Sequence, residues 1–118
     1  MTEIRWYWEE DDFGISAEGH AEFNPGNDIV CSAISALLQT LWAGLEVCCF
    51  TPVEHKQESG VFKLTGSVYG YKERVIGLFD SILFGLEQIA ERYPDNVKIE
   101  RVKGEGETPS DTLYDSDV

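Results

Sequence analysis

The sequence DIVCSAISALLQTLWAGL, residues 28–45, carries the clearest structural signal in the chain. Apolar residues recur along it at the spacing of an α-helix. They are Ile29, Val30, Ala33, Ile34, Leu37, Leu38, Leu41, Trp42 and Leu45. Asp28 comes just before this pattern, where a carboxylate can accept hydrogen bonds from the free amides of a first helical turn. We therefore predict a helix that Asp28 caps and that ends near Gly44.

A second helical pattern is predicted over Lys72–Tyr93, where Pro94 stops it. One apolar stripe advances in steps of four and three residues, through Val75, Phe79, Ile82, Leu86, Ile89 and Tyr93. Ile76 and Leu83 add apolar surface outside this stripe. Since both helices are strongly apolar for so small a domain, we expect a homodimer that forms through the helices.

Alternating and apolar segments around the helices predict five strands. We place them at Thr2–Glu9, Phe13–His20, Leu45–Thr51, Val61–Tyr69 and Val97–Val102, with the polar stretch Val53–Gly60 as a loop. The predicted order is β-β-α-β-β-α-β. This order indicates an α+β fold with a small mixed sheet and two helices.

Charge and composition limit the kinds of partner that the chain can bind. The 118 residues hold 22 acidic and nine basic side chains, a formal net charge of -13. Nucleic acids and anionic membranes repel such a chain, whereas a basic protein partner is compatible with it. Neither a membrane span nor a secretory signal is evident, so we expect a soluble, cytoplasmic protein. We assign residues 1–103 to one domain and residues 104–118 to an acidic, disordered tail.

The cysteines do not indicate a disulfide framework or a metal site. Cys48 and Cys49 are adjacent and no CxxC pair occurs, so we interpret both as strand residues, with at least one buried. His55 lies in the predicted polar loop, where we expect it to be solvated. A metal site of His20, Cys31 and His55 would lack a fourth ligand and the usual short ligand spacing.

His20, the loop after it and Cys31 form the chemically suggestive part of the sequence. Cys31 lies in the predicted first helical turn, where free amides and the helix dipole favour a thiolate and can hold an oxyanion. His20 is a candidate general base and acid if the loop returns it to the helix start. The competing interpretation is that Cys31 is a core residue and His20 is structural or exposed.

The same residues resemble a signature of the ribosomal-processing cysteine protease family Prp. That signature is a Gly-His-Ala segment, a variable loop and Asp-x-Val-Cys-x-Ala-x-Ser at a helix start. Here it is matched by Gly19-His20-Ala21 and by Asp28-Ile29-Val30-Cys31-Ser32-Ala33-Ile34-Ser35. The predicted element order also agrees with the fold of that family.

The resemblance implies a cysteine protease with Cys31 as nucleophile and His20 as its acid–base partner. Gly19, Asp28 and Ser35 would support the site, and no cofactor or metal would be needed. Members of the family are homodimers that remove the N-terminal extension of large-subunit ribosomal protein twenty-seven, cutting after an aromatic pair. The acidic tail departs from the family pattern. Two alternatives therefore stay open: a protease acting on a phage protein, or a binding protein of the same fold that does not cut.

Overall fold

The computed structural model describes residues 1–103 and shows one sheet with two helices. The predicted tail, residues 104–118, lies outside the described residues. The elements follow in the order β1 (Thr2–Glu9), β2 (Asp12–Glu18), α1 (Ile29–Val47), β3 (Val53–Glu58), β4 (Val61–Ser67), α2 (Lys72–Arg92) and β5 (Val97–Arg101). The predicted β-β-α-β-β-α-β order and the α+β class are thus confirmed.

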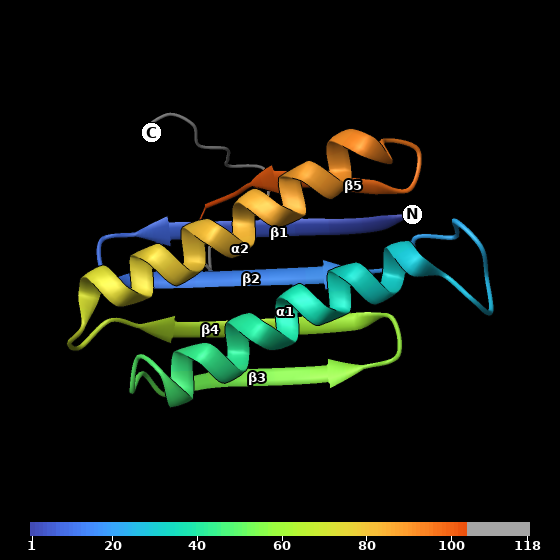
Figure 1. The fold of residues 1–118 in the computed structure, drawn as a ribbon. Helices are drawn as coiled ribbons and strands as arrows, with labels where there is room; N and C mark the ends of the chain where they lie inside the picture. Colours follow the sequence, from blue (N-terminus) through green and yellow to red (C-terminus); the bar gives the residue numbers. More distant parts are fainter. Residues whose placement is uncertain (104–118) are drawn as a thin grey trace.

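The five strands form one mixed sheet in the order β3-β4-β2-β1-β5. β1 pairs with β5 in parallel, and every other neighbouring pair is antiparallel. Both helices lie across the same face of this sheet, α2 over β1 and β5 and α1 over β4 and β3 (Figure 1). The start of α1 therefore lies near the end of the sheet where β2 finishes and the β3–β4 turn is found.

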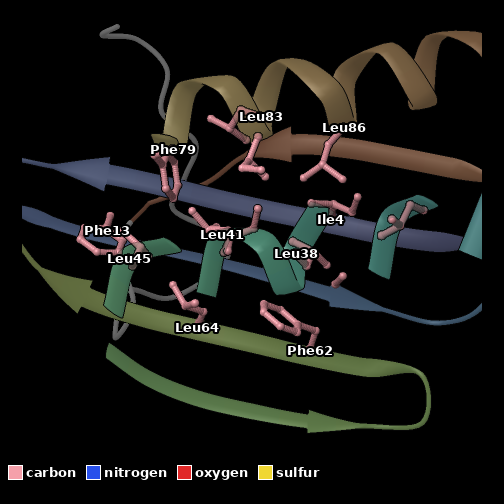
Figure 2. Packing of buried hydrophobic residues seen from close by; sticks show 14 of the residues in the cluster. Ile4, Phe13, Leu38, Leu41, Leu45, Phe62, Leu64, Phe79, Leu83 and Leu86 are labelled. Atoms are coloured by element: carbon pink, nitrogen blue, oxygen red, sulfur yellow. The ribbon is translucent and has the colours of Figure 1, made fainter. Parts of the chain in front are cut away.

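The core fills the space between the sheet and the helices (Figure 2). Alternate residues of the strands face the helices: Phe13, Ile15 and Ala17 of β2 are buried, as are Phe62 and Leu64 of β4. The stripe of α2 is buried at Val75, Phe79, Ile82 and Leu86. The buried residues of the strands and those of α2 therefore meet on the same side of the sheet.

The third strand was predicted in the wrong place. Leu45–Thr51 is not a strand, because α1 continues to Val47 and is capped by Cys48. The strand is Val53–Glu58, in the stretch predicted to be a loop. The reason is that β3 is an edge strand in which only Val53 and His55 are partly covered, so its sequence is mostly polar.

The predictions for three side chains near this strand change accordingly. Cys48 and Cys49 lie after the helix and not in a strand, although Cys49 is buried and Cys48 is exposed. His55 is not solvated, because its ring stacks on Trp42 with centroids 4.1 Å apart and an interplanar angle of 6°. The ring of Phe62 makes a T-shaped contact with the same histidine, with ring centroids 5.2 Å apart.

Both helices bury apolar residues in the core of the single chain. Leu83, whose apolar character was one reason to expect a dimer, is only 6% exposed and belongs to the core of the single chain. Among the described residues, α1 is the one helix whose length and composition would suit a membrane span. Five of its residues are instead buried in the core: Val30, Ile34, Leu38, Leu41 and Leu45.

Candidate active site

A pocket of about 350 Å³ lies at the end of the sheet beside the start of α1. His20 and Cys31 both line it, so the fold brings together the two residues that the sequence singled out. The same pocket is also lined by Gly19, by Ser35 and by the β3–β4 turn at Ser59 and Gly60. The complete lining is Thr2, Ala17, Gly19, His20, Cys31, Ile34, Ser35, Leu38, Gln57, Glu58, Ser59, Gly60, Val61 and Phe62.

Asp28 joins the loop to the helix start. Its Oδ1 atom accepts hydrogen bonds from the backbone N–H groups of Val30 at 2.9 Å and Cys31 at 3.0 Å. Its Oδ2 atom accepts from the N–H groups of Phe23 at 2.9 Å and Asn24 at 3.3 Å. Loss of solvent opposes ionisation of the carboxyl, but these four donors outweigh it and hold the pKa of Asp28 below its usual value. The predicted N-cap is confirmed, and it also clamps the loop.

This clamp corrects one expectation about the helix start. The amides of Val30 and Cys31 were expected to be free to hold an oxyanion, but both donate to Asp28. The amide of Ser32 is also occupied, since it donates to the carbonyl oxygen of Asp28 at 3.0 Å. An N-cap carboxylate that satisfies the first turn takes the donors that a reacting carbonyl would need.

A different backbone amide lies at the sulfur of Cys31. The N–H of Ala21 donates to the Sγ atom of Cys31 with a distance of 3.3 Å between nitrogen and sulfur. The carbonyl oxygen of the same residue accepts a hydrogen bond of 2.8 Å from Nδ2 of Asn96. Asn96, in the loop between α2 and β5, therefore binds the peptide that follows Ala21, the residue whose N–H contacts the sulfur. Nothing in the sequence pointed to Asn96, which lies 75 residues away from Ala21.

His20 lies just beyond the end of β2, which finishes at Glu18 and not at His20 as predicted. Its side chain is exposed on the pocket wall. Gly19 has a positive φ of 95°, and a Cβ atom there would collide with the carbonyl oxygen of Met1. Gly19 is thus needed for a close approach, and the neighbour that requires it is the start of the chain.

Ser35 lies at the pocket, whereas the two tryptophans of β1 lie away from it. Ser35 follows Cys31 by one helical turn and lines the same pocket. Trp6 and Trp8 pack on Phe79 in the core, with ring centroids 6.1 and 5.2 Å apart, and do not line this pocket. Residues 1–103 contain no group of three or more histidine, cysteine or acidic side chains placed to hold a metal.

The family follows from a comparison of the sequence with protein-family models. A model described as cysteine protease Prp matches residues 1–98. The chain belongs to the Prp family of cysteine proteases. A search among curated proteins finds no significant match.

Solved structures agree with this fold. Prp from S. aureus in complex with a covalently linked product peptide is 21% identical, with a TM-score of 0.74. The comparison covers 86% of this chain and 99% of that one. SMU.848 from Streptococcus mutans is 27% identical, with a TM-score of 0.72 and coverage of 86% and 96%. Prp from S. aureus with a substrate peptide gives 20% identity, a TM-score of 0.71 and coverage of 86% and 99%.

Proposed function

We propose that this Prp-family chain is a cysteine endopeptidase in which Cys31 is the nucleophile and His20 the general acid and base. The observation that carries this proposal is that both side chains line one pocket, with the N–H of Ala21 directed at the sulfur. The thiolate is the reactive form of a cysteine, so the nucleophile needs a base in its own pocket, and His20 supplies one. The half-buried position of Cys31 leaves that sulfur accessible from the pocket.

The proposed reaction is acyl transfer in two stages. His20 takes the proton of the Cys31 thiol, and the sulfur attacks the scissile carbonyl carbon to form a C–S bond. We assign the resulting oxyanion to the N–H of Ala21, because attack moves negative charge from the sulfur to the oxygen and so releases this donor, whereas the amides of Val30 and Cys31 stay bonded to Asp28. The C–N bond then breaks, and His20 gives its proton to the leaving amine.

Water completes the reaction. His20 removes a proton from a water molecule, and the oxygen attacks the thioester carbon. The C–S bond breaks, the carboxylic acid product leaves, and the sulfur recovers the proton from His20. This sequence uses side chains and backbone amides of the chain itself, and it calls for no cofactor.

The proposed substrate is the precursor of large-subunit ribosomal protein twenty-seven, cut after an aromatic pair in its N-terminal extension. The support comes from the family and from S. aureus Prp, a ribosomal processing protease solved with a product peptide and with a substrate peptide. The net charge of -13 suits a basic polypeptide partner. Such a reaction would take place in the cytoplasm, where it would support ribosome assembly.

We also propose that the chain acts as a homodimer that associates through its helices. From residue 29 to residue 45, α1 carries no charged side chain, although the whole chain carries 31. On α2, Phe84 is 63% exposed. An uncharged helix face beside an exposed aromatic ring is suited to a second copy of the same surface.

A cleavage assay with intact-mass readout tests the function. The purified chain is mixed with the extended ribosomal protein precursor, in parallel with Cys31→Ala and, as a matched control, Cys48→Ala. We expect one cut after the aromatic pair, retained in Cys48→Ala and lost in Cys31→Ala. Cleavage by a folded Cys31→Ala protein would refute the mechanism. Binding of the precursor without any cut would favour the non-catalytic alternative, and cleavage of a phage precursor alone would replace the ribosomal substrate.

A further inference from the structure

The β3–β4 turn lies against the segment that carries His20. Glu18 of β2 pairs with Val61 of β4, so the residues just beyond this pair, Gly19 and Gly60, lie side by side. The N–H of Gly19 donates to the carbonyl oxygen of Gly60 at 2.8 Å. This bond extends the β2–β4 pairing by one step and fixes the chain immediately before His20.

The imidazole of His20 then lies over the α-carbon of Gly60. A Cβ atom at position 60 would lie 2.9 Å from Nε2, 3.4 Å from Cε1 and 3.5 Å from Cδ2 of His20. The first distance is shorter than Cβ atoms in proteins adopt, so a side chain at position 60 would require the ring to move. The space taken by a methyl group is thus already occupied by the edge of the imidazole.

We propose that Gly60 is a positioning residue, which holds the imidazole of His20 in place in the pocket that Cys31 also lines. This inference rests on the proposed function, because it concerns the geometry of the proposed Cys31–His20 pair. Gly60 acts in two ways: its carbonyl oxygen holds Gly19, and its missing side chain leaves room for the ring. A displacement of about 1 Å in a reacting group can cost about 100-fold in rate.

The backbone at Gly60 requires a careful control, because its φ of 76° is itself unfavourable for other residues. Gly26 supplies that control. It has a φ of 92°, and a Cβ atom there would meet nothing within 4 Å. Gly26→Ala therefore adds a similar backbone strain without touching His20, whereas Gly60→Ala adds the strain and the collision.

The first measurement is steady-state cleavage of a substrate peptide by both variants, with circular dichroism to show that each is folded. We expect Gly60→Ala to lower kcat by about 100-fold with little change in KM, because the ring and not the substrate is displaced. Gly26→Ala should lose no more than about threefold. Equal losses in kcat in the two variants would refute the positioning role. If Gly60→Ala does not fold, Gly60→Asn replaces it, since asparagine tolerates positive φ and carries the same Cβ.

The second measurement does not depend on the substrate. The rate of Cys31 alkylation by iodoacetamide is followed by peptide mass mapping in wild type, Gly60→Ala, His20→Ala and the double variant. If Gly60 acts through His20, Gly60→Ala slows alkylation in the wild-type background and adds nothing in the His20→Ala background. A further loss in the double variant would overturn the inference. Failure of the wild-type chain to cleave any precursor would instead count against the proposed function, and the alkylation cycle would still report on Gly60.

Discussion

The carboxylate of Asp28 accepts a hydrogen bond of 3.0 Å from the backbone N–H of Cys31, the residue three positions later. The same carboxylate holds the N–H groups of Phe23 and Asn24 in the preceding loop. One side chain therefore sets both the start of α1 and the path of the chain from His20 to Cys31. It also means that the N–H groups of Val30 and Cys31 are already bonded, whereas the N–H of Ala21 is directed at the sulfur.

Replacing Asp28 should loosen the helix start and the loop together. Asp28→Ala removes the acceptor for four amides and should lower Tm by about 5 °C. Asp28→Asn keeps one acceptor oxygen for the helix amides but offers an NH₂ group toward Phe23 and Asn24, so its loss should be smaller. Thermal unfolding followed by circular dichroism gives the three Tm values. Equal Tm for wild type and Asp28→Ala would contradict the clamp.

The clamp should also depend on pH in a defined direction. The pKa of Asp28 is lowered in the folded chain from the ordinary value of 3.8, so the folded state favours the carboxylate. Its stabilising effect is fully present above pH 3.8 and is lost as the pH falls through the lower folded value. The Tm gap between wild type and Asp28→Asn should therefore be constant near neutral pH and close only below 3.8. A gap that closes between pH 7 and 5 would show that another group is responsible.

The three cysteines should differ in their reactivity. We expect alkylation of the folded chain near pH 7 to modify Cys31 about tenfold faster than Cys48, because His20 lines the same pocket and can take the proton of the Cys31 thiol. Cys49 should react last, since burial and the adjacent Cys48 raise the pKa of its thiol more than Arg74 lowers it. Timed quenching and peptide mass mapping give the three rates. A Cys31 that reacts no faster than Cys48 would argue against an activated nucleophile.

His55 offers a stability test away from the pocket. Its ring stacks on Trp42, and within residues 1–103 its buried Nε2 atom has no hydrogen-bond partner. His55→Ala should lower the free energy of unfolding by about 1–2 kcal/mol through loss of the ring contacts. His55→Phe keeps a ring and removes the unsatisfied nitrogen, so it should be as stable as wild type or more stable. Urea unfolding gives the free energy of unfolding of both variants. A His55→Phe variant as unstable as His55→Ala would show that the ring contacts do not stabilise the chain.

The proposed dimer predicts a specific sensitivity of α2. Sedimentation velocity should show a dimer for wild type and a monomer for Phe84→Glu, because a charge would be buried at the interface. Tyr69→Ser is the matched control, since Tyr69 is 82% exposed but lies outside both helices. A monomeric wild-type chain, or a Phe84→Glu protein that stays dimeric, would contradict association through this surface.

The sequence predicted those parts of the fold in which local pattern and tertiary packing agree. The alternation in Phe13, Ile15 and Ala17 and the stripe of α2 match the buried residues. The third strand failed because an edge strand needs few apolar residues, so Val53–Glu58 resembled a loop. Leu45 fitted both the helical pattern and the start of the predicted strand, and in the structure it continues the buried stripe of α1 from Leu41.

The sequence predicted only the part of the site whose residues lie close together in the chain. His20, Asp28 and Cys31 lie within a dozen residues, and their motif brought out all three. Asn96 and Gly60 reach the site from the α2–β5 loop and the β3–β4 turn, which only the folded sheet brings near Cys31. The sequence also did not reveal that the amides of Val30 and Cys31 are occupied. A capping residue indicates where a helix starts, but not whether the N–H groups of the first turn stay free.

The most direct test of the account is to identify the residue that a substrate-like electrophile modifies. A short peptide ending in an aromatic pair and a C-terminal chloromethyl ketone is incubated with the folded chain, and the adduct is located by peptide mass mapping. We predict one adduct, on Cys31, which forms more slowly in His20→Ala and not at all in Cys31→Ala. An adduct on another residue, or an unmodified Cys31 in a chain that cleaves its precursor, would contradict the assignment of Cys31 as the nucleophile.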